Sequence, residues 1–106
     1  MDETPFPELT MSANHPNLFP PKFHPGKVYA SRGAMALGVD LTPFLDRHVR
    51  ADWGDELDFN DILANEQALE TGDRLLSKYR VRPGVSIYIL TEWDRSATTV
   101  LLPEEY

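Results

Sequence analysis

Two side chains suited to acid–base chemistry lie close together in the chain. His48 and Asp52 are four residues apart, a spacing that places them on one face of a helix. An imidazole beside a carboxylate can act as a general base with its orienting group. Arg74, Glu92 and Arg95 could supply charge partners for a substrate. This pattern is that of a small hydrolase or nuclease-like enzyme, with His48, Asp52 and Glu92 as catalytic candidates.

Most of these residues also have a structural interpretation. His48 falls on a partly apolar helix, where a packed, hydrogen-bonded histidine is the commoner case. Arg74 and Glu92 are expected opposite each other on neighbouring strands, where opposite charges pair. Arg95 is expected at the centre of a turn, where nothing structural demands a guanidinium. Arg95 is therefore the strongest single functional candidate.

The stretch Arg74–Leu102 is expected to form a three-stranded antiparallel meander, because its apolar residues alternate with polar ones. A three-residue loop at Arg82-Pro83-Gly84, with Gly84 left-handed, pairs Val81 with Val85 and Tyr79 with Ile87 and keeps the apolar residues on one face. The second loop is expected at Asp94-Arg95-Ser96-Ala97, which sets Trp93 opposite Thr98 and Thr91 opposite Val100. The inner face then holds Tyr79, Ile87, Ile89 and Val100.

The outer face of this meander carries Thr99 and a row of leucines, Leu76, Leu90 and Leu101. Such a row needs a cover, and a homodimer or a partner protein could provide it. Trp53 and Trp93 are expected to fill the core.

The residues before the meander predict helices and one short strand. Lys27–Ser31 alternates like a strand, and Arg32–Leu37 reads as a short helix. A second helix is expected over Pro43–Ala51, capped by Thr42. A third is expected from a cap at Asp58, through Leu63, to a stop at Gly72.

The predicted fold is therefore α+β, with a three- or four-stranded antiparallel sheet and two or three helices packed on one face. Residues 26–106 form this domain. Residues 1–25 hold six of the nine prolines, so they are expected to be an extended or disordered arm.

The net charge of −7 is concentrated in one segment. Residues 54–73 contain seven acidic residues and no Lys or Arg, so the remaining 10 acidic and 10 basic residues balance. The segment is expected to be a solvated helix face, or else a surface that mimics phosphate or binds a basic partner. Direct nucleic-acid binding is disfavoured, because phosphate contacts require clustered cations. The candidate binding residues are Asp55, Glu56, Asp58, Asp61, Arg74, Glu92, Asp94, Arg95 and Thr99.

Composition excludes several classes. The chain has no cysteine, which rules out disulfides and thiol catalysis and fits a reducing compartment. No run of about 18 apolar residues is present, so no membrane span is expected. His15 and His24 lack acidic neighbours and are expected to be surface residues, so no metal or cofactor is expected. A cytoplasmic protein is the default expectation.

Several strings over Gly26–Tyr106 resemble a family of small bacterial proteins of plasmids and integrative elements. Members carry labels such as "plasmid-related protein" or "type I restriction endonuclease subunit M". The strings are Arg47-His48-Val49, Asp52-Trp53-Gly54, Gly72-Asp73-Arg74-Leu75-Leu76-Ser77-Lys78-Tyr79, Thr91-Glu92-Trp93-Asp94-Arg95-Ser96-Ala97-Thr98-Thr99 and Leu101-Leu102-Pro103-Glu104-Glu105-Tyr106.

The resemblance implies a mobile-element setting, and no activity comes with it. A methyltransferase is not supported, because the chain lacks a glycine-rich strand-to-helix turn for an adenosyl cofactor and is too short for that fold. The favoured hypothesis is a non-catalytic interaction protein, such as an inhibitor of a host defence nuclease or another nucleic-acid enzyme. The partner would bind the acidic helix or the leucine row. The enzyme using His48 and Asp52 is the alternative.

Overall fold

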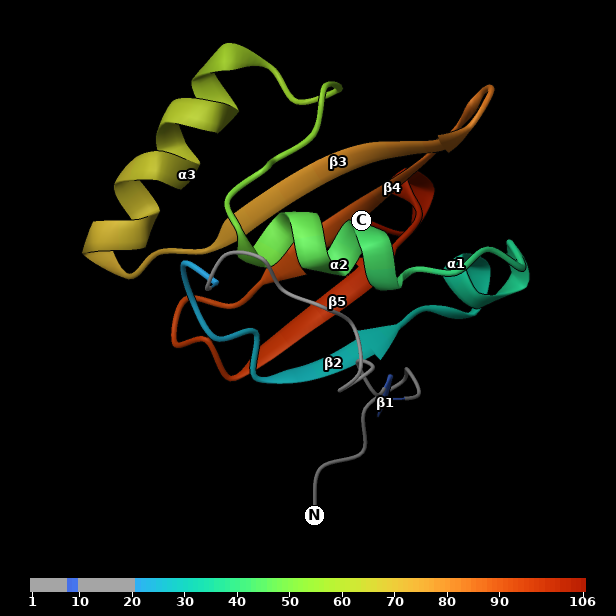
Figure 1. Cartoon of the computed structure of the whole chain (residues 1–106), viewed down its shortest axis with the longest axis horizontal. Helices are drawn as coiled ribbons and strands as arrows, with labels where there is room; N and C mark the ends of the chain where they lie inside the picture. Colours follow the sequence, from blue (N-terminus) through green and yellow to red (C-terminus); the bar gives the residue numbers. More distant parts are fainter. Residues whose placement is uncertain (1–7, 10–20) are drawn as a thin grey trace.

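A mixed β-sheet with strand order β1-β2-β5-β4-β3 forms the centre of the molecule (Figure 1). The computed structural model describes residues 8–9 and 21–106, and most of the predicted arm lies outside them. The fold is α+β, as predicted. Its elements are β1 (Glu8–Leu9), β2 (Lys27–Ala30), α1 (Arg32–Ala36), α2 (Thr42–Val49), α3 (Phe59–Thr71), β3 (Leu75–Arg82), β4 (Val85–Thr91), β5 (Ala97–Leu101) and the 3-10 helix η1 (Pro103–Glu105).

The predicted meander is confirmed as β3, β4 and β5, and a fourth strand joins it in parallel orientation. β2 pairs with β5 in parallel, with Lys27 opposite Ala97 and Ala30 opposite Val100. The sheet is therefore mixed rather than antiparallel throughout. The two residues of β1 pair antiparallel with β2.

The first hairpin has the predicted pairing in its body and a different end. Tyr79 lies opposite Ile87, as expected, but Arg82 faces Val85 and the register shifts between Arg80 and Arg82. The extra residue, Val81, therefore lies within β3 and not in a three-residue loop. The predicted pair of Val81 with Val85 is wrong. The apolar face survives, because either solution preserves the alternation.

The second hairpin differs from the prediction by two residues. Thr91 lies opposite Thr98, and Ile89 opposite Val100. A shift of two keeps every side chain on its predicted face, and Tyr79, Ile87, Ile89 and Val100 are all buried in one cluster. Trp93 leaves the ladder and is 63% exposed, so its predicted core role is wrong.

The same shift breaks the expected leucine row. Leu76 faces Leu90, but Leu90 faces Thr99, and Leu101 lies opposite Tyr88. Leu101 is only 6% exposed. On this face Tyr106, the residue after η1, packs against Tyr88, with ring centroids 5.2 Å apart. A homodimer through this face stays a prediction.

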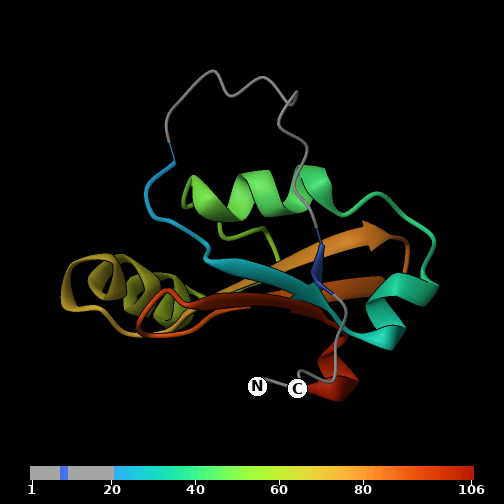
Figure 2. The same ribbon diagram turned by 90° about the horizontal axis from the view of Figure 1, so that it is seen from below.

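The two faces of the sheet are covered by different helices. α2 lies across the inner face, and η1 lies on the opposite side (Figure 2). Leu45, His48 and Val49 of α2 are buried, as their helical spacing predicts. α2 begins at Thr42 with Leu41 as its cap, one residue earlier than expected. It ends at Val49, because Arg50 and Ala51 leave helical geometry.

α3 lies beside the free edge of β3 (Figure 1). Its predicted ends are confirmed: the Asp58 side chain accepts a hydrogen bond from the Asp61 N–H, and Gly72 is left-handed. The buried Asn65 amide donates to the Leu76 carbonyl (2.6 Å) and accepts from the Leu76 N–H (3.0 Å). A side-chain amide therefore replaces the peptide of a neighbouring strand, which satisfies the edge.

The segment before β2 packs on the body, although its prolines had assigned it to the arm. The Lys22 N–H donates to the Val49 carbonyl (2.7 Å), and Phe23 stacks on Trp53 at 6.3 Å. Among the described residues, no helix is long and apolar enough to cross a membrane.

Gly54 provides a test of how the loop before α3 closes on β3. The Lys78 N–H donates to the Trp53 carbonyl (3.0 Å), and a Cβ at Gly54 would lie 2.0 Å from the Lys78 carbonyl oxygen. Gly54→Ala should lower the free energy of unfolding by about 3 kcal/mol. Gly84→Ala is the matched control, because Gly84 also has positive φ but nothing within 4 Å of its Cβ position. It should cost about 1 kcal/mol. Equal losses in urea denaturation would contradict the close contact.

Candidate functional site

His48 lies at the centre of a buried chain of hydrogen bonds. The residue is fully buried, and its Nδ1 lies 2.5 Å from the Ser77 hydroxyl. Its Nε2 lies 2.8 Å from Thr91 Oγ1. Thr91 is in turn 2.7 Å from Thr98 Oγ1, and Thr98 donates to the Pro25 carbonyl at 2.7 Å. These hydrogen bonds join α2, three strands and the segment before β2.

The last hydrogen bond of this network, from Thr98 to Pro25, determines which atom carries each proton. A carbonyl only accepts, so the single hydroxyl proton of Thr98 goes to Pro25. Thr91 must then donate to Thr98, and His48 must donate its Nε2–H to Thr91. Nδ1 is left as the acceptor for the Ser77 hydroxyl. This assignment, made from the hydrogen-bond network, gives a neutral His48 with both ring nitrogens used inside the core.

His48 and Asp52 do not act as a pair. Asp52 lies beyond the end of α2, and its carboxylate accepts from Arg47 Nε at 2.7 Å and Nη2 at 3.2 Å. The Arg47 guanidinium lowers the pKa of Asp52. Since the partners of His48 are Ser77 and Thr91, Asp52 does not orient the imidazole. The predicted spacing assumed a helix through Ala51, and the helix ends two residues earlier.

Arg95 has a structural role that the sequence did not reveal. It lies at φ 60°, a left-handed conformation that costs an L-residue about 1–2 kcal/mol. Its guanidinium donates to the Ala68 carbonyl of α3 (2.8 Å) and the Asp73 carbonyl (2.5 Å). It also lies 5.8 Å from the Phe23 ring. These contacts join the β4–β5 loop to the end of α3 and offset the backbone cost, so the expectation that nothing demands a guanidinium is wrong.

The other predicted site residues fall into two groups. Arg74, Glu92 and Asp94 lie with Arg95 where β3 begins and β4 ends. Among the described residues the ion pairs are Arg47–Asp52, Arg50–Asp46 and Arg80–Glu56, so the predicted Arg74–Glu92 pair is not formed. The Asp94 carboxylate accepts from the Ser96 N–H (3.0 Å), and Thr99 faces outward opposite Leu90.

The acidic candidates form the second group, in α3 and the loop before it. Glu56 pairs with Arg80 at 2.8 Å, and a hydrogen bond from Ser86 together with this cation lowers the pKa of Glu56. Asp58 caps α3. Asp55 and Asp61 are exposed. Glu66 accepts a hydrogen bond from the Trp53 indole (2.7 Å). Trp53 itself is buried in a core cluster, as predicted.

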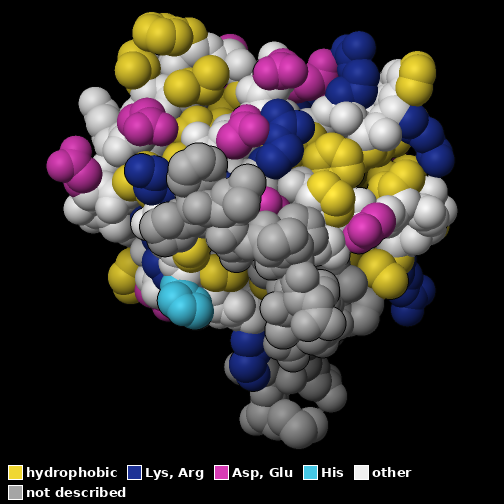
Figure 3. Space-filling view, viewed as in Figure 1, with side chains coloured by type: hydrophobic (Ala, Val, Ile, Leu, Met, Phe, Trp, Pro, Cys, Tyr) yellow, Lys and Arg dark blue, Asp and Glu magenta, His cyan; other side chains and the backbone are white. Residues whose placement is uncertain are grey.

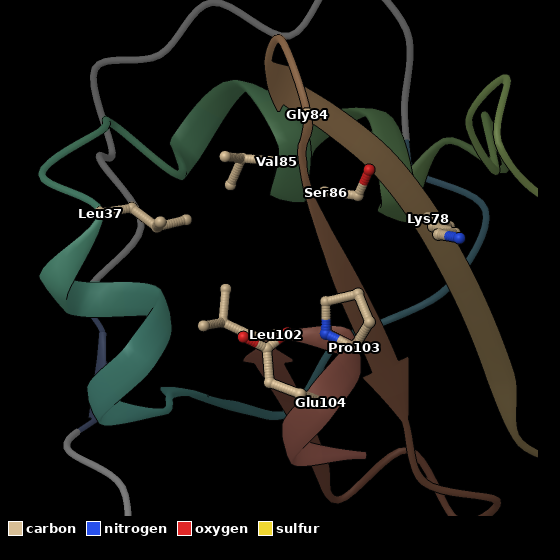
Figure 4. A pocket seen from close by; sticks show the side chains of 8 residues that line it. All are labelled: Leu37, Lys78, Gly84, Val85, Ser86, Leu102, Pro103 and Glu104. Carbon is tan, nitrogen blue, oxygen red and sulfur yellow. The ribbon is translucent and has the colours of Figure 1, made fainter.

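A groove of about 390 Å³ lies between the end of α1, the β3–β4 hairpin and η1 (Figure 4). Leu37, Val85 and Leu102 turn toward its centre, with Lys78 and Glu104 also lining it. It contains none of the predicted site residues. Sequence reasoning missed it because its walls come from segments far apart in the chain.

Comparison of the chain with protein-family models, with curated proteins and with solved structures finds no significant match. Within the described residues, no group of three or more His, Asp or Glu side chains is arranged to hold a metal ion.

The buried imidazole should make stability depend on pH. Burial, with a smaller effect from Arg95, lowers the pKa of His48 to about 3. The unfolded chain binds this proton near pH 6.5, so stability is fully present above that pH and falls as pH decreases toward 3. The expected slope in the free energy of unfolding is about 1.4 kcal/mol per pH unit. Urea denaturation between about pH 6.5 and 5.5 measures it, because the slope approaches this value there while carboxylates of ordinary pKa remain ionised.

The His48→Gln variant should show a clearly shallower slope over that interval, although it is less stable at neutral pH. Leu45→Ala lowers stability in the same core without removing a titratable group and serves as the control, whose slope should match the unsubstituted chain. An unchanged slope in His48→Gln would contradict the neutral, buried assignment.

Arg95 can be tested by a substitution that keeps its charge. Arg95→Lys cannot reach the Ala68 and Asp73 carbonyls together, so the free energy of unfolding should fall by about 2 kcal/mol. Arg74→Lys, at an exposed position, should change it by less than about 0.5 kcal/mol. Equal stability of the two variants in thermal denaturation would rule out the structural role of Arg95.

Proposed function

We propose that this chain is a small acidic, non-catalytic interaction protein that occupies a surface on a partner protein. The observation that carries the proposal is the concentration of charge: residues 54–73 hold seven carboxylates and no cation, which equals the whole net charge of −7. α3 and the loop before it present this charge, and one member, Glu56, is balanced by a cation of the fold.

The rigid attachment of α3 supports this proposal. Asn65 binds the backbone of β3, Glu66 binds Trp53, and Arg95 binds the helix end at Ala68. A surface that is already ordered loses little conformational entropy on binding. Acidic surfaces also steer basic partners to themselves at low ionic strength.

The setting of the proposal comes from the sequence resemblance. The resemblance supports a protein encoded by a bacterial mobile element, and the proposed partner is a host defence nuclease or another nucleic-acid enzyme. A cytoplasmic location is proposed from the composition. The hydrolase alternative with His48, Asp52, Arg74, Glu92 and Arg95 gains no support from the geometry of its acid–base pair. Both nitrogens of His48 are engaged inside the core, and Asp52 is paired with Arg47.

The proposal predicts that charge position, and not total charge, determines partner capture. One triple variant neutralises exposed acids of the segment: Asp55→Asn, Asp61→Asn and Glu70→Gln. Its control neutralises three exposed acids elsewhere: Asp40→Asn, Asp94→Asn and Glu104→Gln. Both have the same net charge, and the asparagines of the control can still accept the turn hydrogen bonds of Asp40 and Asp94.

Tagged forms of each variant are used to capture proteins from extracts of the chain's own host. The first variant should lose the partner that the unsubstituted chain retains, whereas the control should keep it. Capture should also weaken steeply with added salt. Equal capture by both variants, or capture that salt does not affect, would overturn the proposal.

A further inference from the structure

The outward face of α3 carries two large apolar side chains. Phe59 is 71% exposed and Leu63 is 45% exposed. They are four residues apart, so they lie next to each other on the helix surface. Gln67 and Glu70 continue the same stripe and are exposed. The buried side of α3 is formed by Asn65 and Ala68.

Solvent exposure of this pair is not caused by a loosely attached helix. The opposite side of α3 is held to the edge of β3 by the two hydrogen bonds of Asn65. Ile62 and Leu69 pack against the cluster formed with Trp53 and Leu75. α3 has therefore already used one side in folding and presents the other as a fixed surface.

Acidic residues flank the apolar pair along the chain, with Asp58 and Asp61 before Leu63 and Glu66 and Glu70 after it. Figure 3 shows hydrophobic and acidic side chains together over α3. Residues 54–73, which include α3 and the loop before it, contain no Lys or Arg. A second copy of the same face would bring like charges together, and a nucleic acid would add phosphates to carboxylates. Both occupants are disfavoured by charge.

We propose that Phe59 and Leu63 are the anchors by which α3 docks into an apolar groove with a basic rim on a partner protein. This inference rests on the proposed function and narrows it, because it names the residues and the kind of surface that they enter. An amphipathic helix with anchors at i and i+4 is a common way to occupy such a groove. The carboxylates would pair with the rim, and the two apolar side chains would supply most of the affinity.

A photo-reactive probe tests the placement of this surface. The full chain is made with benzoyl-phenylalanine in place of Gln67, one turn beyond Leu63, and irradiated in the chain's own host. The control carries the same group in place of Met35, which is 48% exposed on α1, at the far end of the molecule from α3 (Figure 1). One protein should crosslink at position 67 and not at position 35.

The crosslinked protein is then purified, and its affinity for the full chain is measured by calorimetry. Phe59→Ala and Leu63→Ala should each weaken binding by about 10-fold or more. Met35→Ala, which removes another exposed apolar group, should change it by less than about 2-fold. Melting curves of the three variants should coincide, because all three side chains are exposed.

Each other outcome contradicts the inference. Crosslinking at position 67 only to a second copy, or to nucleic acid, would assign a different occupant. A partner that binds in a salt-dependent way with undiminished affinity for Phe59→Ala would remove the anchors while leaving the acidic interaction protein intact. Absence of any crosslink together with equal capture by the two triple-charge variants would remove both proposals.

Discussion

Hydrogen bonds from His48 to two neighbouring strands constrain how α2 lies across the sheet. An unpaired polar atom in the core costs about 1–3 kcal/mol, and this site contains an imidazole and three hydroxyl groups. All are satisfied together only when His48 stands between Ser77 and Thr91, with Thr98 beside Thr91 and the Pro25 carbonyl at the end. The apolar contacts around Leu45 and Ile89 would tolerate small shifts of the helix, whereas this chain of hydrogen bonds would not.

Two further polar contacts extend this constraint to α3. Asn65 replaces a missing strand at the edge of β3, and Arg95 holds the other end of the helix through carbonyl groups of Ala68 and Asp73. The side chains that first suggested chemistry, His48 and Arg95, are thus used to position elements. The stripe of Phe59 and Leu63 and the groove beside Leu102 remain accessible to a partner. Neither contains a buried hydrogen-bond network like that of His48.

Alternation and end signals predicted the elements well, because both are local. Asp58 and Gly72 mark the ends of α3 in the sequence, and the period of two placed Tyr79, Ile87 and Ile89 on one face. Loop lengths were less accessible. A loop longer by two residues preserves the alternation, so nothing in the sequence distinguished Thr91 opposite Thr98 from Thr91 opposite Val100. Trp93 and the leucine row were misplaced for that reason.

The candidate site was less predictable, since it depends on contacts between distant segments. The hydrogen bonds of Arg95 end on backbone carbonyls, which carry no residue-specific signal, so no pattern of side chains could reveal them. The parallel partner of β2 is equally invisible, because a short alternating segment does not state which strand it joins. The exposure of Phe59 and Leu63 could have been inferred from the helical wheel, where they lie away from Ile62, Asn65 and Leu69.

The parallel pairing of β2 with β5 has a consequence for how the chain folds as it is synthesised. Lys27 and Ala97 are neighbours in the sheet yet are separated by most of the polypeptide. While the ribosome is still adding the intervening helices and hairpins, β2 has only the two residues of β1 to pair with, and the Thr98 hydroxyl that binds Pro25 does not yet exist. Contacts of such long sequence separation slow folding. The nascent N-terminal half therefore exposes an unpaired edge until the last strand emerges, and it is at this stage that chaperones would meet it.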